Sequence, residues 1–190
     1  NAKDEVKKEY GDYIAILNTG DQLDPLAFIM AAQKIVTDLN IDVLYSDEDN
    51  IDKRGKISDP IFKPEWSPDL LLTQYYFGNL TLFNKNAVDL EKGIDWSLAN
   101  AAVHDLALRV TEKTNRIFHI PEVLFHRARQ INIDDKKLQT RKVIENTIKR
   151  RSLPVFLTED NLYPDLLIPH WKLVNEPLIS IVILNKDQPR

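Results

Sequence analysis

An apolar strand, a helix and a second apolar strand follow one another closely near the start of the chain, and this order restricts the fold more than any other feature. Tyr13–Leu17 is a short apolar run of the kind found in buried parallel strands, and the turn-forming residues 18–21 end it. Pro25 suits the first turn of a helix that we expect to continue to about Leu39. A second strand follows at Val43–Tyr45 and ends in a polar, acidic stretch. Because parallel strands are joined by crossover helices, the sequence predicts an α/β domain.

The rest of the chain alternates between apolar runs and amphipathic segments. The helix after Pro25 has an expected buried face made of Phe28, Ala31, Ala32, Ile35 and Leu39. Further strands are expected at Leu80–Phe83, Ile117–Ile120, Val123–Phe125 and Leu178–Leu184, with a hairpin at Val155–Leu157 and Leu166–Ile168. Helices are expected at Asp69–Gln74 with Ser67 as N-cap, at Ala101–Thr114 and at Asp134–Arg151. The last helix has a narrow apolar stripe, which predicts a position on the surface.

Composition excludes several classes of function. The formal net charge of −4 argues against a general affinity for nucleic acid or for an anionic membrane. The chain has no cysteine, so it cannot form a disulfide, a cysteine zinc site or a thiol nucleophile. No apolar stretch has the ~20 residues that a membrane-spanning helix needs. We therefore expect one sizeable domain with an appendage, in a cytoplasmic protein that lies free or at the inner face of the membrane.

Five stretches of the chain form an ordered series of motifs. They are Gly11–Pro25, Tyr45–Asp52, Ser58–Leu72, Asp105–His126 and Pro177–Pro189. In this order they resemble family 2, nucleotide-sugar-dependent glycosyltransferases, and in particular the rhamnosyltransferase-like bacterial polysaccharide enzymes that carry two such domains in tandem. The resemblance implies a partial nucleotide-diphospho-sugar transferase (GT-A-like) sandwich with a mixed, mainly parallel sheet. Residues 1–130 would be the C-terminal half of a first domain, 131–176 a connecting helix and hairpin, and 177–190 the start of a second domain.

The metal-binding motif of the family is incomplete in this sequence. Enzymes of the family neutralise the departing diphosphate with Mg²⁺ or Mn²⁺, which prefers oxygen ligands such as aspartate. By resemblance, Asn18 and Gly20 occupy the positions of the two spaced aspartates, and Asp21 alone is retained. We therefore expect no cofactor for this segment and interpret residues 18–21 as a turn and helix N-cap, whereas the alternative is that these residues still bind a metal ion.

The catalytic base of the family is also replaced. By resemblance, Val103 stands at the position of the carboxylate that accepts the proton of the acceptor hydroxyl, and Asp105 is the retained second acid. Asp105 is expected to position its helix. His104, beside the lost base, is the alternative proton acceptor.

Several other residues are candidate ligands of sugar, nucleotide or metal. Asp47, Glu48 and Asp49 form the densest carboxylate cluster, and resemblance places them at the floor of the donor and acceptor cleft. Trp66 either stacks on a sugar face or wedges its loop against the sheet. His126 either helps to hold a metal or is a hydrogen-bonded residue at a strand end, and for His119 and His170 no partner can be named.

These residues support two main hypotheses about function. The first is a glycosyltransferase-like protein of bacterial surface-polysaccharide synthesis that is inactive as this segment. The second is a non-catalytic docking or glycan-binding module of a larger tandem transferase, whose partners would be the remainder of that transferase, nucleotide sugar and glycan acceptor. A hydrolase that uses the carboxylates of Asp47–Asp49 is a third alternative. The apolar run Ile179–Leu184 is further expected to fill an open sheet edge, within the chain or swapped from a second copy in a homodimer.

Overall fold

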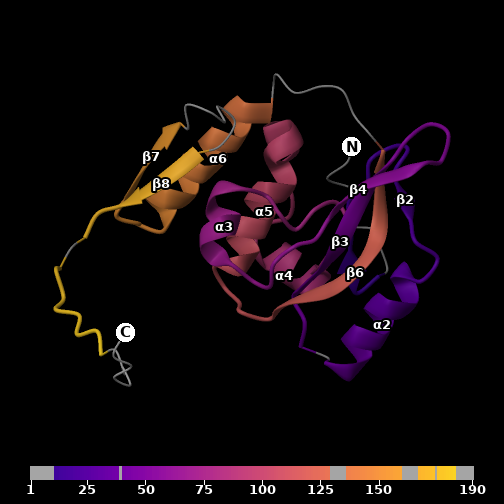
Figure 1. The fold of residues 1–190 in the computed structure, drawn as a ribbon, viewed down its shortest axis with the longest axis horizontal. Coiled ribbons are helices and arrows are strands. Elements are labelled where there is room, and N and C mark those ends of the chain that lie inside the picture. Colours follow the sequence, from indigo (N-terminus) through magenta and orange to yellow (C-terminus); the bar gives the residue numbers. More distant parts are fainter. Residues whose placement is uncertain (1–10, 39, 129–135, 160–166, 174, 183–190) are drawn as a thin grey trace, which may run out of the picture.

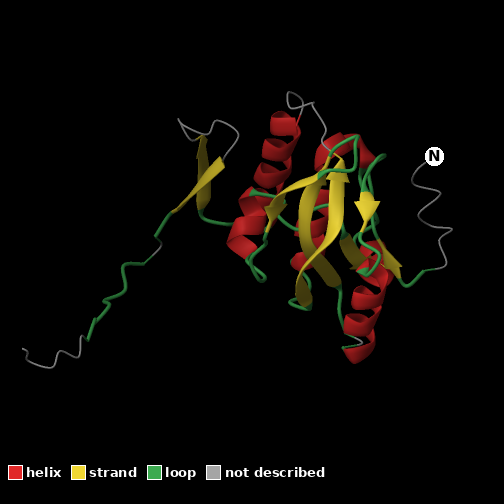
Figure 2. Cartoon of the chain, turned by 45° about the vertical axis from the view of Figure 1, so that its right-hand side comes forward, coloured by secondary structure: helices red, strands yellow, loops and turns green. Residues whose placement is uncertain are grey.

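A central mixed sheet lies between helices on both of its faces in the computed structural model, as Figures 1 and 2 show. The structure describes residues 11–38, 40–128, 136–159, 167–173 and 175–182. The strands are β1 (Tyr13–Ile14), β2 (Gln22–Leu23), β3 (Val43–Ile51), β4 (Ile57–Ile61), β5 (Thr81–Asn84), β6 (Ile117–Ala128), β7 (Val155–Glu159) and β8 (Leu167–Trp171). The helices are α2 (Ala27–Thr37), α3 (Pro68–Thr73), α4 (Lys85–Leu90), the 3₁₀ helix η1 (Trp96–Ala101), α5 (Ala102–Thr111) and α6 (Lys136–Arg150).

The sheet has the strand order β1-β5-β3-β6-β2, and β4 pairs with β3 beyond this path. Within the described residues β3 and β6 form a parallel pair, whereas the pairings β1–β5, β2–β6, β3–β4 and β3–β5 are antiparallel. The α/β class and the mixed sheet are thus confirmed, but the prediction that the sheet is mainly parallel is wrong. The reason is that β5, which comes between β3 and α5 in the sequence, pairs antiparallel with β3. Among the described strands, a crossover joins parallel neighbours only from β3 to β6.

Two strands are longer than their sequence patterns indicated. β3 does not end at Tyr45 but continues through the acidic residues to Ile51, because β6 runs beside it for its whole length. β6 is likewise one strand, although Pro121 was expected to divide it. Ser46 pairs with Ile120 and Asp47 with Val123, so Pro121 lies in a bulge where its missing N–H breaks no ladder bond.

Residues of β3 contribute to two separate hydrophobic clusters, one on each face of the sheet. Val43 and Tyr45 belong to the cluster with α3, α5 and α6, whereas Leu44 belongs to the cluster with α2. This alternation is the period of two that a strand imposes on its side chains. The short helix α3 begins as expected, because the side chain of Ser67 accepts a hydrogen bond from the backbone N–H of Leu70.

The helices α2 and α6 pack differently from their predicted faces. α2 buries Ala27 and Ala31 against the sheet, while Phe28 is 69% exposed, so the predicted face of α2 is shifted. α6 was expected on the surface, but Val143 and Ile144 are fully buried in the larger cluster. A narrow stripe is sufficient here because it fits against α5 and η1.

The C-terminal part of the described chain extends away from the sheet (Figure 1). β7 and β8 form an antiparallel hairpin, as predicted. Leu178, Ile179, Ile181 and Val182 are 80–103% exposed and outside any strand, so residues 178–182 do not fill a sheet edge within the chain. The swapped arrangement and the predicted domain boundaries stay predictions. The helices of the described segments include none that is both long and apolar enough for a membrane span.

The burial of α6 predicts that Ile144→Ala lowers the free energy of unfolding by about 2–5 kcal/mol, because it leaves a cavity in the core. Lys149→Ala, on the exposed side of the same helix, is the control and should change stability by no more than about 0.5 kcal/mol. Urea unfolding followed by circular dichroism measures both. Equal, small effects would mean that α6 does not belong to the core.

Candidate functional site

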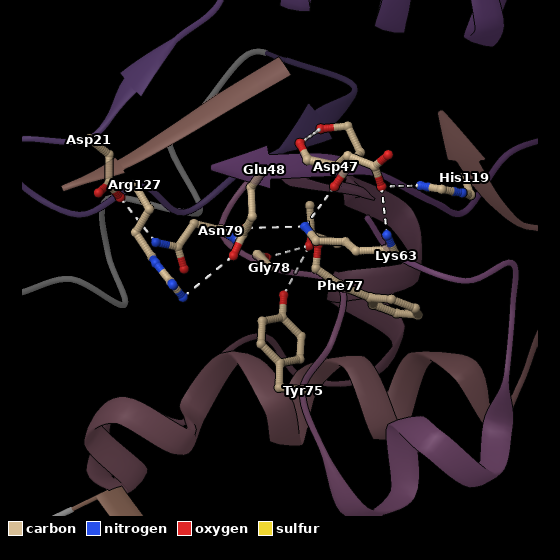
Figure 3. A network of polar contacts seen from close by, with 12 residues as sticks. Asp21, Asp47, Glu48, Lys63, Tyr75, Phe77, Gly78, Asn79, His119 and Arg127 are labelled. Carbon is tan, nitrogen blue, oxygen red and sulfur yellow. Dashed lines mark hydrogen bonds and ion pairs between the residues drawn. The ribbon is translucent and has the colours of Figure 1, made fainter. Parts of the chain in front are cut away.

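The three consecutive acidic residues of β3 lie inside the sheet, and each has a partner within the protein. Figure 3 shows Asp47 and Glu48 with theirs. Asp47, Glu48 and Asp49 are 3–5% exposed. A buried carboxylate is strongly unfavourable unless a cation or hydrogen-bond donors compensate it. The partners of these side chains therefore decide what the site can do.

Asp47 and Asp49 each bind a histidine of β6. His119 Nε2 lies 2.8 Å from Asp47 Oδ1, and His126 Nδ1 lies 2.7 Å from Asp49 Oδ1. Asp47 Oδ1 also accepts a hydrogen bond of 2.8 Å from the backbone N–H of Lys63. The parallel pairing of β3 with β6 brings these groups together, so both histidines have structural partners.

Glu48 forms a buried ion pair with Lys63. The two side chains are 5% and 2% exposed, and Lys63 Nζ lies 3.1 Å from Glu48 Oε2. The same ammonium donates to the carbonyl oxygens of Ser46 at 2.6 Å and Phe77 at 2.7 Å, which accounts for its three protons. Burial lowers the pKa of Lys63, and the charge of Glu48 opposes this shift.

Two further residues complete the surroundings of Glu48. The backbone N–H of Asn79 donates to Glu48 Oε2 at 3.3 Å, and Arg127 Nη1 lies 3.5 Å from Oε1. Arg127 also donates from Nε and Nη2 to Asn50 Oδ1 at 3.2 and 3.1 Å. Both oxygens of Glu48 thus face positive or N–H groups of the protein.

Residues 18–21, where the sequence predicted an incomplete metal motif, form a turn that the side chain of Asp21 holds. Gly20 has φ +93°, a conformation that favours glycine. Asp21 accepts hydrogen bonds from the backbone N–H of Asn18 at 3.0 Å, from Asn79 Nδ2 at 3.1 Å and from the backbone N–H of Ala128 at 2.9 Å. Both carboxylate oxygens are therefore occupied, Asn18 is exposed, and Gly20 has no ligand atom in a side chain.

These residues do not fit Mg²⁺ or Mn²⁺, which need several oxygen ligands in close geometry. Among the described residues, no three histidine, aspartate or glutamate side chains lie together as ligands of a metal ion. Besides Asp49, His126 faces Asp24 across 4.0 Å, on its Nε2 side. A metal role of His126 stays a prediction.

At the predicted position of the catalytic base and beside it, Val103 and His104 pack within the protein. Val103 is half-buried and packs against the larger cluster. His104 is buried, and its Nε2 must donate to the carbonyl oxygen of Leu71 at 2.7 Å, because a carbonyl only accepts. That nitrogen therefore cannot take a proton from a substrate.

Asp105 holds Arg109, one helical turn further along α5. Arg109 Nε lies 2.8 Å from Asp105 Oδ2, and its other nitrogens donate to the carbonyl oxygens of Glu91 and, at 2.9 Å, of Gly93. Through Arg109, Asp105 ties α5 to the loop that precedes η1. This arrangement agrees with the expectation that Asp105 positions its helix.

Trp66 makes the contact that a wedge requires. It is half-buried, and its ring lies 5.8 Å from that of Phe77, tilted by 46°. Stacking of Trp66 on a sugar stays a prediction.

Sequence reasoning missed Lys63, Gly78 and Asn79 and named no partner for His119 or His170. His119 binds Asp47, and His170 lies 2.7 Å from the hydroxyl of Thr158 across the β7–β8 hairpin. Lys63 lies within the stretch Ser58–Leu72, between Phe62 and Pro64. Its apolar neighbours are the one local signal for partial burial. The pairing partners themselves depend on strand register, which no local pattern contains.

Gly78 makes the Glu48–Lys63 pair possible, and a methyl group there would collide with it. Its φ is +78°, and an added Cβ would lie 2.0 Å from Glu48 Oε2 and 2.2 Å from Lys63 Nζ. We expect Gly78→Ala to lower the free energy of unfolding by about 2–5 kcal/mol through strain and overpacking. Gly55→Ala is the matched control, because Gly55 has φ +79° but nothing within 4 Å, so it should lose only about 1–2 kcal/mol. Equal losses in urea unfolding would contradict the steric role of Gly78.

Two buried tyrosines, Tyr45 of β3 and Tyr76, predict a loss of stability at alkaline pH. Burial raises the pKa of both Tyr45 and Tyr76 above the usual 10. A raised pKa stabilises the fold fully below pH 10, and the contribution falls as pH rises, because the unfolded chain then loses protons that the folded chain retains. Above pH 11, where the opposite contribution of Lys63 has ended, the free energy of unfolding should fall as pH rises, because the folded chain retains tyrosine protons that the unfolded chain loses. Unfolding at several pH values measures this slope, and Tyr76→Phe should reduce it; an unchanged slope in that variant would contradict the assignment.

The chain is similar in sequence to proteins whose names refer to polysaccharide synthesis. No family model matches the chain. The chain is 28% identical over 187 residues to the O-antigen biosynthesis protein RfbC of Myxococcus xanthus, covering 94% of this chain and 14% of that protein. It is 31% identical over 188 residues to the uncharacterized protein y4gI of Sinorhizobium fredii, covering 93% and 21%, and 29% identical over 141 residues to the chondroitin synthase of Escherichia coli, covering 73% and 20%. It thus spans about a seventh to a fifth of these relatives.

A solved structure shares the fold. The crystal structure of S. aureus TarS 1–349 matches with a TM-score of 0.56 at 14% identity, over 77% of this chain and 43% of that chain. At this identity the match establishes the fold class alone, a partial GT-A-like fold. Together with the names of the sequence relatives, it supports the resemblance: the chain is glycosyltransferase-like.

Proposed function

We propose that this chain is a segment of a bacterial surface-polysaccharide protein and that it does not itself transfer sugar. Sugar transfer with inversion requires neutralisation of the diphosphate leaving group and a base for the acceptor hydroxyl. The positions that would supply them are occupied by Asn18, Gly20 and Val103. The names of the relatives, among them an O-antigen biosynthesis protein and a chondroitin synthase, support the pathway class.

The observation that carries the proposal is the internal compensation of every nearby carboxylate. Asp21 accepts hydrogen bonds from three N–H donors, Asp47 and Asp49 bind histidines, and Glu48 binds Lys63. To coordinate a cation, these carboxylates would have to give up partners that the buried strand needs. The same pairing argues against a hydrolase that uses Asp47 and Asp49.

The second candidate is a non-catalytic docking or glycan-binding module of a larger tandem transferase. Two observations favour it: the chain spans only a small part of its relatives, and Trp66 is only half-buried. In this role the partner would be the remainder of a transferase, together with its nucleotide sugar and glycan acceptor. Such a protein would act in the cytoplasm or at the inner face of the membrane.

Assays of donor use test the proposal. We expect no release of nucleoside diphosphate from UDP-glucose, UDP-N-acetylglucosamine or dTDP-rhamnose above the rate without protein, with Mg²⁺ or Mn²⁺ present. Calorimetry should likewise record no heat of binding for Mn²⁺ with UDP. Turnover by the unmodified chain would overturn the proposal.

A restoring variant separates the loss of ligands from a general defect of the fold. Asn18→Asp combined with Gly20→Asp returns two carboxylates to the turn, and it should create Mn²⁺ binding that calorimetry detects, because oxygen ligands and negative charge are regained. The single variant Thr19→Asp, in the same exposed turn, is the control for added charge. Equal Mn²⁺ binding by both variants would show that unspecific charge, and not the spaced motif, controls metal affinity.

A further inference from the structure

A small cavity lies at the end of β3 that is opposite to the acidic residues. It has a volume of about 240 Å³ and opens between α4, the C-terminal end of α5 and the segments that precede β3 and β6. Asp42 lines the cavity and precedes Glu48 by six residues of extended chain, which corresponds to about 20 Å. The cavity is therefore separate from the candidate site around Glu48.

A buried ion pair gives the cavity a fixed wall. Asp42 is 6% exposed, and its Oδ2 accepts hydrogen bonds from Arg116 Nε at 2.9 Å and Nη2 at 2.7 Å. The backbone holds the same residues together, because the N–H groups of Asp42 and Val43 donate to the carbonyl oxygen of Arg116 at 2.9 and 3.2 Å. No hydrogen bond among the described residues uses Arg116 Nη1, so its N–H groups remain available to a ligand.

The rest of the lining offers further polar groups. Asn86, Glu91 and Lys113 line the cavity, and within the described residues their side chains make no hydrogen bond or ion pair. An amide both donates and accepts, a carboxylate accepts, and an ammonium donates. A ligand in the cavity can therefore form hydrogen bonds of both kinds.

The charges and the apolar part of the lining restrict the class of ligand. Two acidic residues, Asp42 and Glu91, face two basic residues, Lys113 and Arg116, so the formal charges of the lining cancel. A phosphate or a divalent cation would thus find no excess of opposite charge. Leu90 adds an apolar surface that is 82% exposed. The lining suits a neutral molecule that has hydroxyl groups on its edge and C–H groups on one face.

We propose that this cavity binds one neutral pyranose ring. Its volume lies below the ~300–1,000 Å³ of pockets that enclose a drug-sized ligand, so a single ring fits better than a nucleotide. A ligand with so few atoms binds weakly, and we expect a dissociation constant of about 1–10 mM. The inference goes beyond the proposed function, because binding at this end of the sheet requires neither a metal ion nor a catalytic base.

Amide chemical shifts of the full chain, labelled with nitrogen-15, test the proposal. The probes are the methyl glycosides of glucose, galactose and N-acetylglucosamine, and rhamnose, each added up to about 50 mM. At least one of them should cause saturable shifts at residues 84–91 and 113–116, whereas inorganic phosphate and Mg²⁺ should not. No saturable shift with any of these sugars, shifts confined to residues around Trp66, or tighter binding of phosphate would overturn the proposal.

Two variants of the lining separate specific binding from a general effect on the protein. Glu91→Ala removes a hydrogen-bond acceptor and should weaken binding of the sugar about fivefold or more. Asp89→Ala is the matched control, because Asp89 is an exposed acidic residue of α4 that does not line the cavity. Leu90→Ser should also weaken binding, and it leaves the core intact because the side chain is exposed. If both lining variants retain the affinity of the unmodified chain, the sugar does not bind in this cavity.

Discussion

The compensation of negative charge inside β3 is the constraint on which the rest of the structure depends. The central strand places three carboxylates in succession where water is excluded, and unpaired they would be strongly destabilising. Their partners come from distant parts of the chain: Lys63 from the loop after β4, and His119 and His126 from β6. Folding of the strand, of that loop and of the turn at Gly78 is therefore coupled, because none of them can be completed without the others.

The charge of Asp21 is compensated in the same way, by groups from distant parts of the chain. Its carboxylate joins the turn at residues 18–21 to Asn79 and to the end of β6. The carboxylate acts as a hydrogen-bond acceptor that organises backbone, a role that needs no cation. The hydrogen bonds of Asp21 thus give this residue a structural role.

Local signals in the sequence predicted local structure well and failed where distant strands decide. Ser67 and Pro68 identify the start of α3, because capping involves only neighbouring residues. By contrast, the acidic residues of β3, taken by themselves, indicate the end of a strand. Only the pairing with the parallel strand β6 extends β3 to Ile51. Pro121 has the same explanation, since a bulge is visible only when both strands are known. The acidic cluster itself is visible in the sequence, whereas the burial of its partner Lys63 is not, because an ammonium is expected in water unless a carboxylate elsewhere holds it.

Helix α2 shows why a periodic pattern can predict an element and still misplace its face. Two apolar stripes of similar strength wind along this helix, and the period of 3.6 residues fits both. The structure buries the stripe with Ala27 and Ala31, whose small side chains allow the helix to lie close to Leu44 and Phe125 of the sheet. Close packing of this kind gains contact along the whole helix backbone, and a stripe led by Phe28 would hold the helix farther away. The large side chains of α2 are exposed because the small ones fit the sheet better, so their exposure is a direct consequence of how the core is packed.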